Sequence, residues 1–147
     1  ALPLAEGGKR NGGEPPTLAQ RLDLESKKAL LVDDNHANIV VANAMLERLD
    51  WLVDVAPNGH QAIEMASEVP YDLILMDLRM PGIDGLETTA RIRKEGVNRE
   101  TPVVALSAYL SEQMKDRCEA AGMNHYLSKP VTRAELARVI DLCTNSV

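Results

Sequence analysis

Four short apolar runs in this chain each stop at a charged or hydroxylated side chain. The runs are residues 29–32 with Asp33 and Asp34, 73–76 with Asp77, 103–106 with Ser107, and 126–128 with Lys129. If the runs are parallel strands of one sheet, their carboxyl ends lie along one edge, where open α/β sheets bind ligands. The endings then gather carboxylates, a hydroxyl and an ammonium in one crevice, which predicts a reaction site at this edge.

Strand and helix patterns alternate five times from Lys27 onward. The expected strands are residues 29–32, 52–56, 72–76, 103–106 and 124–127, and a helix with an apolar stripe follows each of them. The first, third and fourth strands are apolar throughout, as central strands are, whereas the second alternates like an edge strand. Alternating β and α units with right-handed crossovers give a doubly wound sheet. The sequence thus predicts a flavodoxin-like α/β fold, with five parallel strands in the order 2-1-3-4-5 and five helices.

The first 26 residues differ from the rest of the chain. They contain two Gly-Gly pairs and Pro15-Pro16, and no sustained apolar period begins before Leu18. Such a composition is typical of a flexible linker. We therefore expect a linker over residues 1–26, in which Leu18, Leu22 and Leu24 could form a short helical lead-in, and one domain over residues 27–147.

The composition excludes several classes of protein. The chain has a formal net charge of −6 and a pI of about 5.1, whereas nucleic-acid binding by bulk electrostatics needs a basic face. No apolar run approaches the length that spans a membrane, and the amino end does not resemble a signal peptide. Cys118 and Cys143 lack metal-ligand spacing. We therefore expect a cytoplasmic location, no nucleic-acid partner and no direct membrane contact.

Asp33, Asp34 and Asp77 follow strands that are neighbours in the order 2-1-3-4-5, so their carboxylates should crowd together. At neutral pH, crowded carboxylates raise one another's pKa unless a cation is present. The candidate cations are the ammonium of Lys129 and a divalent metal, and oxygen ligands without nearby His or Cys favour Mg²⁺. An alternative is that these residues cap helices. Capping could explain Asp34 and Asn35 but not Asp77, which lies several residues before its helix.

Other phosphate and metal motifs are absent from the sequence. In the loop that starts at Asp77, the third and fifth positions are Arg79 and Pro81, where a calcium EF-hand needs oxygen ligands. The chain has no glycine-rich phosphate loop followed by Lys and Ser or Thr, and no serine in a nucleophile elbow. These absences argue against calcium binding, P-loop nucleotide hydrolysis and serine hydrolase chemistry.

Residues 27–143 resemble a response-regulator receiver domain. The matching elements are Asp33-Asp34, Asp77, Met80-Pro81-Gly82, Asp84-Gly85, Ser107-Ala108 and Lys129-Pro130, and their spacings match as well. Within the family, the chain looks most like the C-terminal receiver of a hybrid sensor histidine kinase. The resemblance implies a module that accepts a phosphoryl group from a phosphohistidine onto an aspartate, with Mg²⁺.

The resemblance also implies a metal site. Asp77 would be the phospho-acceptor and a ligand of Mg²⁺. Asp34 would bind the metal directly, and Asp33 would help through a water molecule. Arg79 would contribute its backbone carbonyl.

A second set of residues would bind the phosphoryl group and respond to it. The resemblance gives Ser107 the role of the hydroxyl that binds the group, and Lys129 the role of the ammonium that pairs with its oxygens. Tyr126 occupies the aromatic switch position, so Ser107 and Tyr126 are expected to change conformation together. The peptide bond between Lys129 and Pro130 is cis in the family.

The function that the resemblance implies is a phospho-accepting receiver module of a two-component phosphorelay. Its donor would be a histidine kinase or a histidine phosphotransfer domain. We expect a receiver excised from the carboxyl end of a hybrid kinase, as the cytoplasmic part of a membrane-bound sensor.

Two alternatives stay open. One is a stand-alone single-domain regulator. The other is an interaction module that works without phosphorylation, although this chain lacks none of the residues that phosphorylation requires. A haloacid-dehalogenase-like phosphatase would need a second Asp where Arg79 stands. Because such a domain acts only on itself, whether it counts as an enzyme is left open.

Overall fold

The computed structural model describes residues 27–144. The expected linker and helical lead-in of residues 1–26 lie outside this part of the chain. The strands are β1 (Lys28–Val32), β2 (Leu52–Ala56), β3 (Leu73–Asp77), β4 (Val103–Ser107) and β5 (His125–Ser128). The helices are α2 (His36–Arg48), α3 (Gly59–Glu68), α4 (Gly85–Lys94), α5 (Glu112–Ala121) and α6 (Arg133–Thr144). None of these helices is long and apolar enough to cross a membrane.

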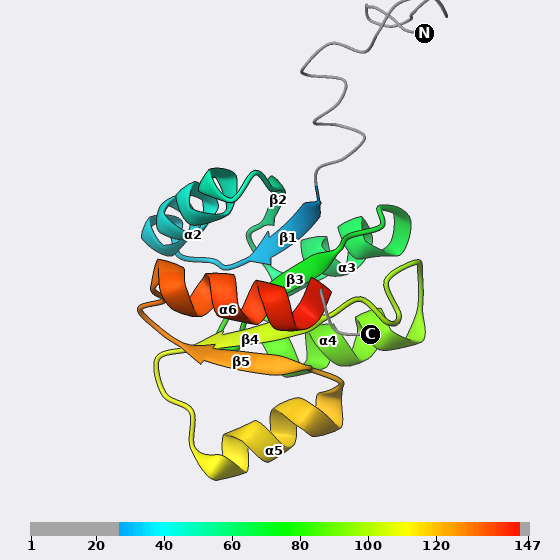
Figure 1. Ribbon diagram of the computed structural model, residues 1–147. Coiled ribbons are helices and arrows are strands. Elements are labelled where there is room, and N and C mark those ends of the chain that lie inside the picture. Colours follow the sequence, from blue (N-terminus) through cyan, green and yellow to red (C-terminus); the bar gives the residue numbers. More distant parts are fainter. Residues whose placement is uncertain (1–26, 145–147) are drawn as a thin grey trace, which may run out of the picture.

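The strands form one parallel sheet in the predicted order, β2-β1-β3-β4-β5 (Figure 1). Alternate residues of each strand point to opposite faces of the sheet. Leu30 and Ile74 pack under α3, α4 and α5 on one face, and Leu31 and Leu75 pack under α2 and α6 on the other. The prediction of a doubly wound sheet is therefore confirmed. All strands run in the same direction, so their carboxyl ends share one edge.

Three strands end one residue later than the apolar pattern predicts. β3 includes Asp77, β4 includes Ser107 and β5 includes Ser128. The apolar pattern marks only buried side chains, whereas the backbone ladder continues through polar residues, with Asp77 opposite Leu106 and Ser107 opposite Ser128. The sheet itself therefore fixes the positions of Asp77 and Ser107.

Asn98 is a fully buried polar residue near the amino ends of the strands. Its amide nitrogen donates to the carbonyl oxygens of Ala66 at 2.6 Å and Val69 at 2.7 Å. Its amide oxygen accepts hydrogen bonds from the backbone N–H of Tyr71 and the hydroxyl of Thr101, both at 2.8 Å. All the hydrogen-bonding positions of the side chain are thereby used. Asn98 thus joins the end of α3 to the segments that precede β3 and β4.

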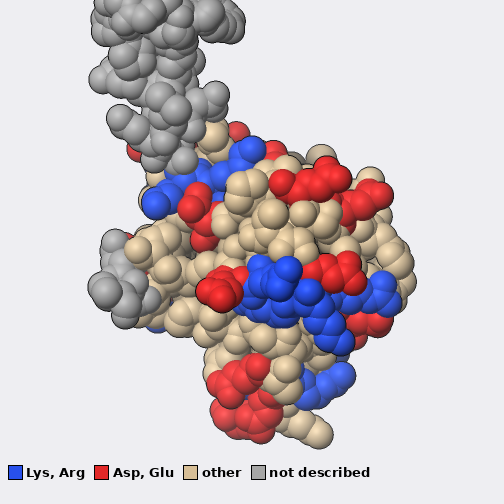
Figure 2. All heavy atoms as spheres, turned by 90° about the vertical axis from the view of Figure 1, so that its right-hand side faces the viewer, with Lys and Arg blue, Asp and Glu red and all other residues tan. Residues whose placement is uncertain are grey.

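Arg93, in the last turn of α4, makes a second cross-link at this edge. Its guanidinium donates to the carbonyl oxygens of Gly122 at 2.9 Å, Arg99 at 3.1 Å and Asn98 at 3.3 Å, and to Asn124 Oδ1 at 2.9 Å. Figure 2 faces this edge and shows Lys and Arg side chains gathered between groups of Asp and Glu. Charges of both signs therefore share the surface at the amino ends of the strands.

Candidate functional site

The carboxyl edge of the sheet gathers carboxylates from two neighbouring strands. Asp33 and Asp34 follow β1, and Asp77 ends β3. One oxygen from each lies within 4.8 Å of the others. Asp33 and Asp77 are only 1% and 4% exposed, whereas Asp34 is exposed. The structure thus brings the predicted acidic residues together, because β1 and β3 are paired in the sheet.

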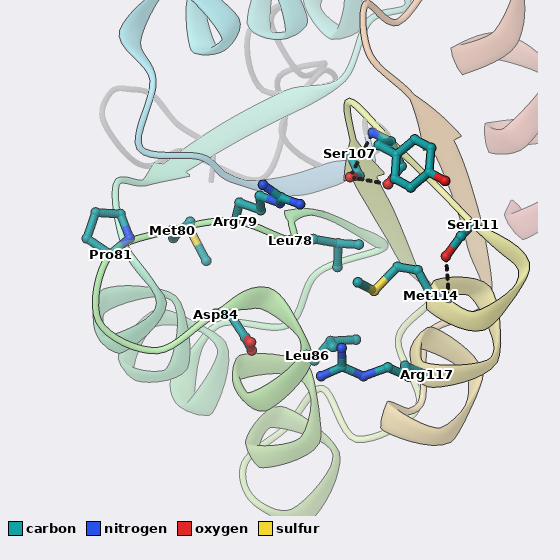
Figure 3. Close-up of a pocket in the computed structure, with 11 residues that line it drawn as sticks. Leu78, Arg79, Met80, Pro81, Asp84, Leu86, Ser107, Ser111, Met114 and Arg117 are labelled. Atoms are coloured by element: carbon teal, nitrogen blue, oxygen red, sulfur yellow. Dashed lines mark hydrogen bonds between the residues drawn. The ribbon is translucent and has the colours of Figure 1, made fainter.

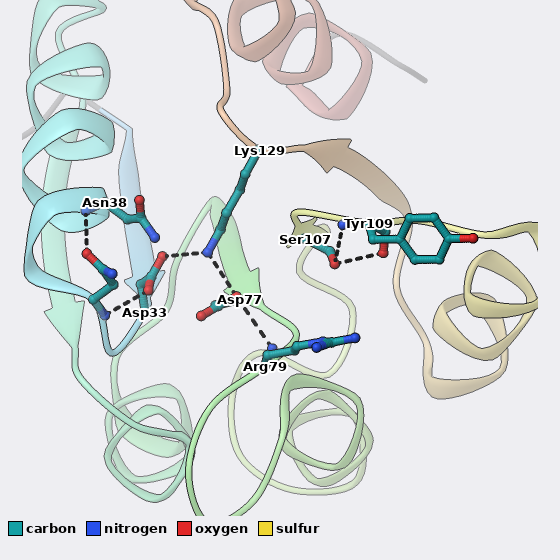
Figure 4. A network of polar contacts seen from close by, with 8 residues as sticks. Asp33, Asn38, Asp77, Arg79, Ser107, Tyr109 and Lys129 are labelled. Carbon is teal, nitrogen blue, oxygen red and sulfur yellow. Dashed lines mark hydrogen bonds and ion pairs between the residues drawn. The ribbon is translucent and has the colours of Figure 1, made fainter.

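Lys129 lies between the two buried carboxylates (Figure 4). The residue directly follows β5, and its Nζ is 3.0 Å from Asp77 Oδ1 and 3.3 Å from Asp33 Oδ2. The peptide bond from Lys129 to Pro130 is cis, as the resemblance implies. One ammonium therefore forms ion pairs with two buried carboxylates.

Lys129 alone does not balance the charge of this cluster. Burial, and to a smaller extent the charge of Asp33, raises the pKa of Asp77 from 3.8 to about 6, although the hydrogen bond from Lys129 acts in the opposite direction. Three carboxylates face a single ammonium, so a further cation would be attracted to the site. A donor set made only of oxygens, with exposed Asp34 on the solvent side, suits Mg²⁺, which retains several waters. The residues present therefore fit a magnesium ion.

Asp34 is not a helix cap. The N-cap of α2 is Asn35, whose side chain accepts a hydrogen bond from the N–H of Asn38 at 3.2 Å. The N–H of Asn35 in turn donates to Asp33 Oδ1 at 2.9 Å, which orients that carboxylate. Asp34 instead lines a cleft of about 290 Å³ together with Asp77. The capping alternative thus holds for Asn35 alone.

The loop after Asp77 turns back onto the end of β3. The N–H of Arg79 donates to Asp77 Oδ1 at 3.4 Å, and the N–H of Gly85 donates to the carbonyl oxygen of Leu78 at 3.1 Å. A side chain at position 85 would collide with the carbonyl oxygen of Asp77. Only glycine therefore lets α4 begin this close to Asp77, with Asp84 as the helix cap. This contact is a physical reason for the Asp84-Gly85 motif.

Ser107 ends β4, but its hydroxyl is directed away from the carboxylates (Figure 4). Ser107 Oγ donates to the carbonyl oxygen of Tyr109 at 2.9 Å and accepts a hydrogen bond from the N–H of Tyr109 at 3.2 Å. Within residues 27–144, Ser107 Oγ makes no hydrogen bond to Asp77. The structure thus places Ser107 at the edge of the cluster without direct contact to it.

Tyr126 lies on β5, apart from the acidic cluster. The side chain is half-buried and packs against the apolar layer beneath α3, α4 and α5. The ammonium of Lys115, on α5, lies 5.2 Å from the centroid of its ring. Sequence reasoning missed Lys115, because no local pattern connects a lysine on one helix to an aromatic residue on the following strand.

Comparison with known proteins identifies the family. The model of the response regulator receiver domain matches residues 29–141. The chain belongs to this family. The predicted family is therefore confirmed, and the acidic cluster lies at the carboxyl edge of the sheet.

Curated relatives of this receiver are sensor kinases. The receiver is 40% identical over 119 residues to the signal transduction histidine-protein kinase BarA of Shigella flexneri, which covers 79% of this chain and 13% of BarA. It is 42% identical over 125 residues to the hybrid signal transduction histidine kinase E of Dictyostelium discoideum, and this match covers 82% of this chain and 7% of that kinase. The predicted similarity to hybrid kinase receivers is confirmed, and the chain spans only a small part of each relative.

Solved receiver structures share the fold. The receiver domain of the sensor histidine kinase PA1611 from Pseudomonas aeruginosa PAO1, crystallised with a magnesium ion coordinated in its active site cleft, is 40% identical with a TM-score of 0.77. The match covers 82% of this chain and 99% of that one. The Saccharomyces cerevisiae co-crystal of the histidine phosphotransfer protein Ypd1 with the Ssk1 receiver contains a match of 27% identity and TM-score 0.74, covering 83% of this chain and 92% of that one.

Proposed function

We propose that this receiver takes a phosphoryl group from a phosphohistidine onto Asp77, with Mg²⁺ as cofactor. The observation that carries the proposal is the placement of Asp77. Its carboxylate is buried at the end of a central strand, beside two further carboxylates and 3.0 Å from the ammonium of Lys129. Phosphoryl transfer requires positioning and charge neutralisation more than covalent chemistry by other side chains, and this cluster supplies both.

In the proposed step, a carboxylate oxygen of Asp77 bonds to phosphorus while the bond from phosphorus to the donor's imidazole nitrogen breaks. The imidazole leaves as a neutral ring after it takes a proton from solvent. With a pKa of about 6, Asp77 is mostly ionised at neutral pH and is able to attack. Lys129 would then pair with the phosphoryl oxygens. Bound Mg²⁺, held by Asp34 and Asp77, with Asp33 through water and the carbonyl of Arg79, would neutralise further charge on the group.

Phosphorylation would change the conformation at Ser107 and Tyr126. The Ser107 hydroxyl now bonds to the backbone of Tyr109, and a phosphoryl group on Asp77 offers it a stronger, charged acceptor. The loop from Ser107 to Ser111 borders an open cleft of about 610 Å³ (Figure 3), so it has room to move. As the loop shifts toward Asp77, Tyr126 would follow into the space behind it.

The donor would dock on α2, next to the acidic cluster. Val40 and Val41 are 53% and 52% exposed, so two adjacent apolar side chains face solvent on this helix. Val41 also borders an apolar groove that reaches Lys129 and Pro130. A helical histidine phosphotransfer domain, or the equivalent domain of a kinase, suits such a surface. The structure of Ssk1 with Ypd1 and the similarity to sensor kinases support a donor of this kind. A cytoplasmic location within a longer sensor kinase is part of the same proposal.

Incubation with acetyl phosphate and Mg²⁺ tests the proposal. We expect the addition of one phosphoryl mass, mapped by peptide mass spectrometry to Asp77 after reduction of the acyl phosphate with borohydride. EDTA should prevent the reaction. Label on another residue, or full labelling in EDTA, would contradict the assignment. A folded protein that takes no label would favour the alternative of an interaction module that works without phosphorylation.

The substitution Asp34→Asn should weaken Mg²⁺ binding by about tenfold or more, because Asp34 is the exposed carboxylate of the cluster. The metal-free variant should be as stable as wild type or more stable, since one of the crowded charges is gone. Calorimetric titration with Mg²⁺ and thermal melts in EDTA measure the two effects. Asp116→Asn removes another exposed carboxylate, on α5, and should change neither the Mg²⁺ affinity nor the melting temperature. A melting temperature of metal-free Asp34→Asn far below that of wild type would show that Asp34 has a structural role instead.

A further inference from the structure

Lys115 and Tyr126 form a contact outside the acidic cluster. The ammonium of Lys115 lies 5.2 Å from the centroid of the Tyr126 ring, within the distance at which a cation is attracted to an aromatic face. The ring is half-buried, and Leu110 and Met114 pack against the same apolar layer. Lys115 therefore places its charge over a ring that this layer covers only in part.

Within residues 27–144, the other partner of the Lys115 ammonium is Glu112. Glu112 Oε2 lies 3.6 Å from Lys115 Nζ, one helical turn away. The Glu112 side chain is 91% exposed, whereas that of Lys115 is 32% exposed. An ion pair with such a solvated carboxylate holds the ammonium only weakly. The ring of Tyr126 is thus the partner that fixes Lys115 in place.

The contact between Lys115 and Tyr126 occurs in the conformation in which the Ser107 hydroxyl is hydrogen-bonded to the backbone of Tyr109. Figure 3 shows that the chain runs from Ser107 through Ser111 into α5, which also carries Lys115. Ser111 caps this helix by accepting a hydrogen bond from the N–H of Met114 at 3.0 Å. A shift of the Ser107 loop therefore acts directly on the helical turn that holds Lys115 over the ring.

We infer that Lys115 is a positioning residue that holds Tyr126 in its resting place and so opposes the switch; the inference rests on the proposed function. Full burial of the Tyr126 ring would separate it from the ammonium, because a lysine charge cannot follow into the apolar layer without a partner. The contact must therefore break before Tyr126 moves inward. Its strength adds to the cost of the phosphorylated conformation and slows the reaction that leads to it.

The rate of phosphorylation by acetyl phosphate tests this inference. Lys115→Ala should increase the rate about two- to fivefold, the factor that corresponds to one cation–aromatic contact. Lys115→Arg should restore the wild-type rate, because a guanidinium also stacks on aromatic rings. Lys94→Ala, which removes an exposed positive charge from α4, is the matched control. Loss of a positive charge by itself would slow the reaction of an anionic donor, so the expected increase has the opposite sign.

A second measurement detects the contact without phosphorylation. The ε-methylene protons of Lys115 should show an upfield ring-current shift in NMR spectra, and Tyr126→Leu should abolish it. A missing shift, or a rate in Lys115→Ala equal to or below that of wild type, overturns the inference while the proposed function stands. A wild-type protein that takes no label contradicts the proposed function itself. The two failures are therefore distinguishable.

Discussion

Asp77→Asn is expected to abolish phosphorylation and to stabilise the metal-free protein at neutral pH. The folded protein raises the pKa of Asp77 from 3.8 to about 6, mainly by burial. The folded state thus binds the proton more tightly than the unfolded state does. The contribution of Asp77 to stability is fully present below about pH 4 and is lost as the pH rises through about 6. An asparagine cannot ionise and escapes this loss. We therefore expect the free energy of unfolding of the variant to exceed that of wild type by an amount on the order of 1–3 kcal/mol near pH 7.

Urea unfolding in EDTA, at about pH 4 and about pH 7, measures this effect. The variant and wild type should have similar free energies of unfolding at the lower pH and should diverge at the higher one. Mg²⁺ should reduce the difference, because it stabilises only the protein that retains all its carboxylates. Asp116→Asn, which removes an exposed carboxylate from α5, serves as the control. Equal stability of Asp77→Asn and wild type at neutral pH would show that Lys129 already neutralises the cluster.

Asn98→Ala should destabilise the protein by about 3–4 kcal/mol. The side chain is fully buried and makes hydrogen bonds to Ala66, Val69, Tyr71 and Thr101. Its removal leaves two buried carbonyl oxygens and a buried N–H without their side-chain partner. Asn98→Asp should destabilise the protein at least as much as Asn98→Ala, because its carboxylate would face the carbonyl oxygens of Ala66 and Val69.

Chemical denaturation of Asn98→Ala against Asn43→Ala measures this loss. Asn43 lies on α2 and is only half-buried, and its side chain makes no hydrogen bond among the described residues. Its substitution should change the free energy of unfolding by less than about 0.5 kcal/mol. A comparable, small effect of both substitutions would mean that waters replace the Asn98 amide.

The fold and the acidic cluster could be predicted because both follow from local patterns. An apolar run that ends in Asp77 is typical of a central strand, and parallel order then places Asp33 and Asp77 side by side. The role of Asn98 could not be predicted, since its partners are backbone atoms from segments distant in sequence. The direction of the Ser107 hydroxyl could not be predicted either, because it depends on the path of the backbone at Tyr109.

The position of Asn98 has a consequence for how such modules can diversify. Its hydrogen bonds lie at the amino ends of the strands, whereas α2, which carries the proposed donor surface on its exposed face, packs against the opposite layer of the core. Substitutions at Val40 and Val41 therefore leave the Asn98 cross-link untouched. Exchanging the exposed face of α2 for that of another receiver should redirect the choice of donor at little cost in folding, which makes this chain a suitable scaffold for rewired signalling.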